Sequence, residues 1–396
     1  MFESFFFAGF EGATGWNRDG QWIDQVAATE HDRFADEDYR RLREVGLLAA
    51  REAVRWPLVD CHGRYDFSTL MPFVRASRAH DIAVVWDLFH FGAPRDLDLF
   101  AEAMPERFAD YCRAVARFLV RETDGPLACT PVNEPSYFAW AAGEAGLFAP
   151  HSRGRSPELK RQLARAAIAG AEAIWQVCPW AEIVSVDSMC RVTAPADAPD
   201  LAAEARRFNQ EIVLESWDMV GGRLAPELGG SRRHLGTLGL NYYWTNQWEL
   251  GRVGTPLADD DARRVSLAEI IGDVWERYGG RVLVTETSHV DEGRAGWIAE
   301  LATVADELLV AHVPLAGVCL YPILGMPEWH TPDVWTRMGL WDVVRGDDAL
   351  HRIAHGPMLE ALRRAQYLDA ACANVRRFAR RPPMLRSRDA RLAVGR

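Results

Sequence analysis

Short apolar runs alternate with longer amphipathic segments along most of the chain, and this alternation constrains the fold more than any other feature. Segment 82–88 is almost continuously apolar, as expected for a parallel strand that is covered on both faces. In segment 36–46 apolar residues recur at helical spacing, and Gly46 ends the helix. The pattern predicts strands near 4–11, 47–53, 82–90, 127–133, 181–187, 235–243, 281–286 and 315–322. It predicts helices near 36–46, 66–80, 97–122, 156–178, 200–219, 266–278, 293–310 and 347–368.

Eight strand-then-helix units predict a single-domain α/β fold, the (β/α)₈ barrel, over residues 1–368 of the 396. A doubly wound sheet is the alternative. It would need a glycine-rich phosphate turn after the first strand, and segment 9–15 lacks the required spacing. The longest irregular stretches, predicted at 135–155, 244–265 and 323–346, follow strands four, six and eight. In a barrel, these loops surround the active site at the carboxyl ends of the strands.

The last residues of the chain differ in composition from the rest. From Arg376 onward there are eight arginines and one acid, Asp389, with two prolines between them. This composition cannot bury a core. We therefore expect 369–396 to form a mobile, arginine-rich C-terminal tail that catalysis does not require.

The net charge limits which classes of molecule the protein is expected to bind, and the cysteines indicate its redox environment. The chain has 45 basic and 56 acidic residues, a formal charge of −11, which disfavours binding to nucleic acid or anionic membranes. No apolar run approaches the ~18–20 residues that span a bilayer, and no signal peptide is evident at the start. The seven cysteines are scattered and never form CxxC, as is typical of reduced thiols. We expect a cytoplasmic protein.

Cofactor chemistry is also restricted. The chain has one lysine, Lys160, in a charged helical stretch, which argues against a Schiff base and against pyridoxal phosphate. The 11 histidines do not cluster, and no His-x-His follows the first strand, so a metal-dependent barrel hydrolase is disfavoured. We expect neither a metal nor an organic cofactor.

Two glutamates stand at the ends of apolar runs. In a barrel, side chains at these strand ends face the active-site end. Glu134 follows strand four, and Glu286 ends strand seven. Glycoside hydrolysis uses two carboxyl groups that face each other across the sugar bond, one as proton donor and one as nucleophile or base. The pair therefore predicts an enzyme that acts on a small carbohydrate or glycoside.

Both glutamates lie in motifs that resemble those of family 1 glycoside hydrolases of the β-glucosidase type. Asn133-Glu134-Pro135 resembles the family's Asn-Glu-Pro acid/base motif, and Val284-Thr285-Glu286 resembles its Ile-Thr-Glu nucleophile motif. Further matches follow in order at 50–57, 87–91, 239–243, 326–329 and 337–340. The chain resembles a compact, divergent member of this family.

The resemblance implies a retaining β-glycosidase in which Glu286 attacks the sugar and Glu134 is the acid/base. Retaining enzymes hold the two carboxyl groups ~5–5.5 Å apart. Arg51 would lie beside Glu286 and keep it ionised. The implied substrate-binding residues are His90, Asn133, Tyr243, Tyr321, Glu328 and Trp329. From the residues alone, a purely structural role in the core stays the alternative for Arg51, Tyr243, His90 and Trp329.

The chain departs from the family pattern on the first and eighth strands. Gly9 or its neighbour stands where the family has a glutamine that grips two sugar hydroxyls, and Tyr321-Pro322 replaces Trp-Ser. We expect the Tyr321–Pro322 bond to be cis, like the family's bond at this place. With Glu328 kept and no lysine nearby, a 6-phosphosugar pocket is not expected.

Two other functions use the same residues differently. A transglycosidase would pass the sugar to an acceptor other than water, and activity with added alcohol would reveal it. A non-catalytic sugar-binding barrel would bind glycans without turnover of any aryl glycoside.

Overall fold

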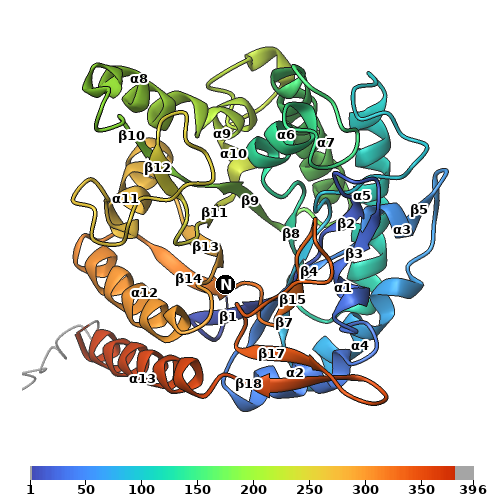
Figure 1. The fold of residues 1–396 in the computed structure, drawn as a ribbon. Helices are drawn as coiled ribbons and strands as arrows, with labels where there is room; N and C mark the ends of the chain where they lie inside the picture. The colour runs from blue at the N-terminus through green and yellow to red at the C-terminus, as the bar shows by residue number, and fades with distance from the viewer. Residues whose placement is uncertain (1, 380–396) are drawn as a thin grey trace, which may run out of the picture.

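Eight parallel strands close into a barrel in the computed structural model, which describes residues 2–379 (Figure 1). In chain order the barrel strands are β1 (Phe6–Gly9), β4 (Ala49–Ala53), β7 (Ala83–Asp87), β8 (Ala128–Thr130), β9 (Glu182–Ser188), β11 (Thr237–Asn241), β13 (Val282–Thr287) and β14 (Leu315–Leu320). β1 pairs with both β14 and β4, which closes the sheet. All eight strands lie where the sequence predicted them, and the predicted fold class is confirmed.

Helices surround the barrel in Figure 1. The main ones are α2 (Ala35–Glu44), α4 (Met71–His80), α5 (Met104–Glu122), α7 (Ser156–Val177), α11 (Leu267–Tyr278), α12 (Gly293–Val310) and α13 (Gly356–Ala379). Shorter helical elements are α1 (Gln25–Ala28), α3 (Trp56–Val59), η1 (Ser68–Leu70), α6 (Pro135–Gly143), η2 (Pro199–Leu201), α8 (Ala202–Arg207), η3 (Phe208–Ile212), α9 (Glu215–Val220), η4 (Pro226–Leu228) and α10 (Arg232–Leu235).

Five pairs of short strands lie outside the barrel. They are β2 (Thr14–Trp16) with β3 (Trp22–Asp24), β5 (Asp60–Cys61) with β6 (Arg64–Tyr65), β10 (Arg191–Thr193) with β12 (Gln247–Glu249), β15 (Met326–Pro327) with β16 (Trp335–Thr336), and β17 (Trp341–Arg345) with β18 (Leu350–Ala354). Most of them belong to the loops that follow the barrel strands, so they build the rim around the mouth.

Side chains fill the interior of the barrel, as expected for this architecture. One apolar cluster inside it comprises Phe7, Ala49, Val85, Ala128, Val184, Val186, Leu283, Cys319 and Tyr321. A larger cluster lies mostly between strands and helices. At Gly239 any Cβ would come within 2.8 Å of both Val186 and Thr285, so a larger residue there would need its neighbours to shift.

A buried ion-pair network ties the hairpin β17–β18 to the barrel. His31 lies 2.9 Å from Asp38 of α2 and 3.0 Å from Glu52 of β4. Arg352 of β18 donates to both oxygens of Asp38 at 2.9 Å. Tyr39 donates to Glu52, also at 2.9 Å. Each charge has a partner of opposite sign, which offsets the cost of burial.

Two predicted helices and one predicted irregular stretch differ in the structure. The segment 347–368 begins with β18 because its first residues pair with β17, and α13 continues past the predicted end to Ala379. The segment 200–219 breaks into α8, η3 and α9. The predicted irregular stretch 135–155 opens with α6, which Pro135 starts at a position where it costs no hydrogen bond. Residues 380–396 of the predicted tail lie outside the described residues.

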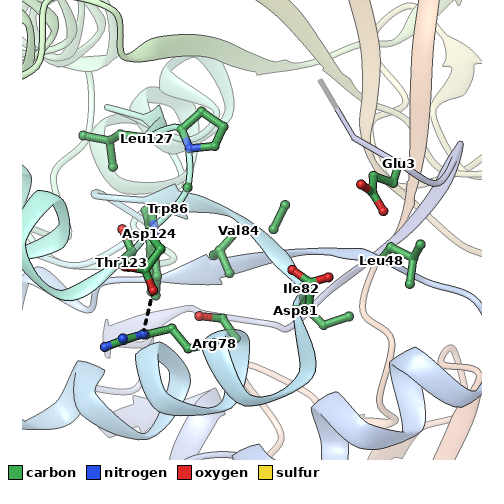
Figure 2. A pocket seen from close by; sticks show the side chains of 14 residues that line it. Glu3, Leu48, Arg78, Asp81, Ile82, Val84, Trp86, Thr123, Asp124 and Leu127 are labelled. Carbon is green, nitrogen blue, oxygen red and sulfur yellow. Dashed lines mark ion pairs between the residues drawn. The ribbon is translucent and has the colours of Figure 1, made fainter.

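The two ends of the barrel differ. A cavity of about 330 Å³ lies at the amino-terminal ends of β4, β7 and β8. Leu48, Ile82 and Leu127 line it (Figure 2). Arg78 and Asp124 form an ion pair of 3.1 Å beside the cavity. It lies at the opposite end of the strands from Glu134 and Glu286. Within residues 2–379, no helix is long and apolar enough to cross a membrane.

Candidate active site

Glu286 lies within β13, and side chains from β4 and from the segment after β11 bind its carboxyl group. Arg51 of β4 donates from Nη1 to Oε1 of Glu286. The hydroxyl of Tyr243, two residues after β11, donates to Oε2 at 2.9 Å. The carboxyl is 5% exposed, so these donors replace most of the water that would otherwise solvate its charge. Both contacts stabilise the ionised form of Glu286.

Arg51 connects three parts of the site. Its Nη2 donates to Oδ2 of Asp87 and to Oδ1 of Asn133, both at 2.6 Å. The guanidinium is 1% exposed. Although burial opposes its charge, Asp87 and Glu286 raise the pKa of Arg51 further above its usual range. A permanently charged arginine therefore fixes Glu286, Asp87 and Asn133 relative to one another.

Glu134 lies between the end of β8 and the start of α6, with a left-handed backbone (φ 45°). Its Oε1 accepts a hydrogen bond of 2.8 Å from Nδ2 of Asn241, the last residue of β11. Asn241 Oδ1 in turn accepts from the hydroxyl of Thr285 at 2.7 Å, which fixes the orientation of the amide. The strained backbone holds the carboxyl at a strand end instead of letting it follow the helix.

The two glutamates have different electrostatic environments. Burial, together with the negative charge of Glu286, raises the pKa of Glu134 well above its ordinary value, although the hydrogen bond from Asn241 opposes this. Glu286, by contrast, has a cation and a hydroxyl as direct partners. Thus the site favours the protonated form of Glu134, while Glu286 faces a cation and a hydroxyl donor. This is the pairing that acid-assisted nucleophilic displacement requires.

Asp187, at the end of β9, fixes the start of α6 just after Glu134. It accepts from the backbone N–H of Ser136 at 3.2 Å and from its hydroxyl at 2.7 Å. The hydroxyl of Ser216, on α9, donates to the same carboxyl. Burial raises the pKa of Asp187 above its usual range, and its charge adds to the pKa increase at Glu134.

His90 follows β7 and forms a second polar centre. Its Nδ1 lies 2.8 Å from Oδ2 of Asp87, while Nε2 lies 3.4 Å from the Tyr321 hydroxyl and 3.6 Å from Oε1 of Glu11. Burial alone would lower the pKa of His90, but the charges of Asp87 and Glu11 outweigh it and raise the pKa. Since Asp87 also binds Arg51, this centre is linked directly to the one around Glu286.

Trp329 lies in an aromatic group on the rim. Its ring meets Phe91 and Phe148 at centroid distances of 5.6 Å. Asn17 and Gln25 donate to the carbonyls of Trp329 and Pro327 at 3.0 and 3.1 Å, which fastens this loop to the segment after β1. The indole N–H is buried and has no hydrogen-bond partner among the described residues.

Most of the sequence-predicted site residues come together at the carboxyl ends of the strands. Hydrogen bonds and short polar contacts link Glu134, Glu286, Arg51, Asn133, Tyr243, His90 and Tyr321. Glu328 is exposed. The predicted cis peptide bond between Tyr321 and Pro322 is confirmed. Among the described residues, no cluster of side chains could hold a metal ion.

Sequence reasoning missed four polar residues of this network: Glu11, Asp87, Asp187 and Asn241. Asp87 and Asn241 each end a barrel strand, so the rule that led to Glu134 and Glu286 would also have found them. Asp187 lies one residue before the end of β9. Glu11 follows β1 by two residues, and its motif was interpreted only at Gly9.

Solved structures show which known fold this chain shares, although no protein-family model and no curated protein matches it. The β-glucosidase from Thermotoga maritima in complex with deoxynojirimycin aligns with a TM-score of 0.72 at 17% identity, covering 94% of this chain and 98% of that chain. The family 1 β-glucosidase from the same organism gives 0.73 at 16% identity, over 92% and 97%. The AHE enzyme from Alicyclobacillus herbarius gives 0.73 at 19%, over 94% and 99%. This chain therefore has the fold of a family 1 β-glucosidase, as its motifs predicted.

Proposed function

We propose that this protein is a retaining β-glycosidase that hydrolyses small β-glycosides. The observation that carries the proposal is the contrast between two buried glutamates at the barrel mouth. Glu286 is bound by Arg51 and Tyr243, whereas burial and the charge of Glu286 raise the pKa of Glu134. The shared fold with β-glucosidases supports the same conclusion.

In the first step, an oxygen of Glu286 attacks the anomeric carbon and the bond to the leaving oxygen breaks. Glu134 gives its proton to that oxygen, so the aglycone leaves as a neutral alcohol. A glycosyl-enzyme ester on Glu286 remains. In the second step, Glu134 takes a proton from water, whose oxygen attacks the same carbon and releases Glu286. Two inversions give a product with the original anomeric configuration.

The environment of Glu134 supports its change of role between the two steps. The negative charge of Glu286 disappears when the ester forms. One of the two main causes of the raised pKa of Glu134 is then removed, and the carboxyl is ionised more readily. A single residue can therefore act as acid first and as base second. Both steps use only side chains and water.

The remaining side chains suit a sugar ring. Asn133, His90 and Tyr321 supply hydrogen-bonding groups, and the partly exposed indole of Trp329 adds an apolar face. Glu328, on the same rim, is exposed and offers a carboxyl group to sugar hydroxyls. We include these residues in the proposed substrate-binding set.

The test is a panel of nitrophenyl β-glycosides with the full-length protein. Proton NMR at early times should show the β-anomer as the first product. A 2-fluoro glycoside with a good leaving group should label Glu286, and peptide mass spectrometry locates the label. First formation of the α-anomer would overturn retention. Product transfer to added methanol in preference to water would favour the transglycosidase, and tight sugar binding without turnover would favour the binding barrel.

A further inference from the structure

A further glutamate, Glu11, lies within the site but has no part in the two displacement steps. It follows β1, three strands around the barrel from β8, which precedes Glu134. The carboxyl is 6% exposed. Its charge contributes to the raised pKa values of Tyr243 and Tyr321, so it lies close to the groups around Glu286. A buried acid beside another acid is costly unless something is gained from it.

We propose that Glu11 determines sugar specificity by accepting hydrogen bonds from substrate hydroxyl groups remote from the anomeric carbon, in a cluster with His90 and Tyr321. The proposal rests on the glycosidase function above and adds the recognition of the sugar to it. The ligand class is a sugar with free hydroxyl donors at the positions that reach this cluster.

The unfilled hydrogen-bonding capacity of Glu11 is the first support. Oε1 accepts from the backbone N–H of Ala13 at 2.8 Å. No hydrogen bond reaches Oε2 from the described residues. Burial raises the pKa of the carboxyl above its usual range, although His90, Ala13 and Tyr321 oppose this. Oε2 is not fully enclosed by protein, so a ligand or solvent can reach it. A carboxyl group has room for about four hydrogen bonds, so the one bond from Ala13 leaves most of this capacity for a ligand.

The spacing within the cluster is the second support. His90 Nε2 lies 3.6 Å from Oε1 of Glu11, 3.4 Å from the Tyr321 hydroxyl and 3.5 Å from Nδ2 of Asn133. Strong hydrogen bonds between such groups are nearer 2.7–3.0 Å. These side chains therefore converge without satisfying one another. A hydroxyl group that both donates and accepts would complete the cluster.

The packing of Tyr321 is the third support, because neighbouring residues fix this side chain in its place in the cluster. A Cβ at Gly9 would lie 2.2 Å from Cδ2 of Tyr321, so the ring occupies the space that any side chain at residue 9 would need. The Tyr321 hydroxyl accepts from the N–H of Gly12 at 3.3 Å. Arg51 lies 5.5 Å from the centre of the same ring. Tyr321 is thus fixed between β1 and Arg51, the residue that binds Glu286.

This arrangement requires the substrate to carry a hydroxyl group at one particular position. A ligand that lacks the hydroxyl opposite Glu11 leaves a buried carboxyl oxygen without a hydrogen-bond partner. Sites built to bind a hydroxyl reject analogues without it far more strongly than apolar pockets reject a missing methylene, by as much as about 10⁴-fold. We therefore expect one position among the 3-, 4- and 6-hydroxyls of the sugar to be required through Glu11.

The experiment compares nitrophenyl β-glucoside with its 3-, 4- and 6-deoxy analogues in four proteins: wild type, Glu11→Ala, Glu11→Gln and Glu144→Gln. Glu144 is exposed beyond α6 and serves as the matched control. The wild type should lose about 100-fold or more in kcat/KM at one deoxy position. Glu11→Ala should lose as much on the parent glucoside but discriminate against that analogue only a few-fold. Glu11→Gln should fall between, and Glu144→Gln should match the wild type.

Binding of deoxynojirimycin, measured by calorimetry, separates the failure of this inference from the failure of the proposed function. Turnover by the wild type with the same deoxy selectivity in Glu11→Ala would overturn the role of Glu11 alone. Absent turnover with binding that weakens about tenfold in Glu11→Ala would overturn the glycosidase and retain the role of Glu11 in sugar recognition. Absent turnover with equal or no binding would overturn both. Circular dichroism melts confirm that each variant is folded, and Glu11→Gln provides the test if Glu11→Ala is not.

Discussion

Asn241 donates a hydrogen bond of 2.8 Å to Oε1 of Glu134, and the Thr285 hydroxyl fixes the donating amide from the other side at 2.7 Å. The bond therefore links β11 to the carboxyl that follows β8, while Thr285 directly precedes Glu286 in β13. This hydrogen bond favours the ionised form of Glu134, against the effects of burial and of Glu286. Asn241 thus limits how far the pKa of the proposed acid can rise.

Replacing Asn241 should move the pH profile in a known direction. Asn241→Ala removes a contact that lowers the pKa of Glu134, so that pKa should rise. The basic limb of the kcat/KM profile should move to higher pH, while the rate at the optimum falls about 10-fold or more. Thr285→Val, which leaves the amide in place but frees its orientation, should give a smaller shift in the same direction. A basic limb that moves to lower pH would contradict this assignment.

Removing the charge of Glu286 should lower the pKa of Glu134. Glu286→Gln keeps the shape of the side chain but removes the negative charge that, after burial, most raises that pKa. Turnover should be lost because the nucleophile is absent. The Glu134 carboxyl, followed by infrared or ¹³C NMR titration, should ionise at lower pH than in the wild type, and the exposed-residue control Glu144→Gln should leave it unchanged. An unaltered titration in Glu286→Gln would mean that the two carboxyl groups do not interact.

Glu134→Ala should affect substrates according to their leaving groups. Glycosides with poor leaving groups need the proton from Glu134 and should lose activity by a factor of about 10³ or more. A dinitrophenyl glycoside needs no such proton, so it should still form the glycosyl-enzyme. Added azide attacks without a general base and should restore turnover, with a β-glycosyl azide as product. Equal losses on both kinds of substrate, with no response to azide, would remove Glu134 from the acid/base role.

Asp187 is a positioning residue for Glu134. Its replacement should therefore also affect substrates according to their leaving groups. Asp187→Asn weakens the contacts to Ser136 that fix the start of α6 just after Glu134. Because a misplaced acid transfers its proton poorly, kcat on poor leaving groups should fall by roughly 100-fold while activated substrates change little. The slope of log kcat against leaving-group pKa should become steeper. A purely structural role would instead reduce thermal stability and leave that slope unchanged.

The sequence predicted the barrel and its two glutamates for the same physical reason. Parallel strands covered on both faces are continuous apolar runs, and a polar residue at the end of such a run, like Glu134 or Glu286, is conspicuous. The contacts of Glu11 could not be predicted this way. They depend on Tyr321 occupying the space above Gly9, a contact between residues far apart in the sequence. β18 was mistaken for the start of a helix because its five residues carry no clear alternation and pair only with β17.

The buried network around His31 should make the stability of the fold depend on alkaline pH. Burial opposes a charged imidazolium, but Glu52 and Asp38 outweigh it and raise the pKa of His31 to about 9, against about 6.5 in an unfolded chain. A raised pKa means that this stabilisation is fully present below pH 6.5 and is lost as the pH rises toward 9. The loss should be roughly 3 kcal/mol of unfolding free energy, measured by urea unfolding between pH 6 and pH 10. His31→Gln should abolish this pH dependence, whereas His80→Gln, at a partly exposed pair with Asp36, should retain it. A wild-type stability that is flat across this range would show that the network binds no more protons in the folded protein than in the unfolded chain, so that His31 is neutral and both carboxyl groups are ionised.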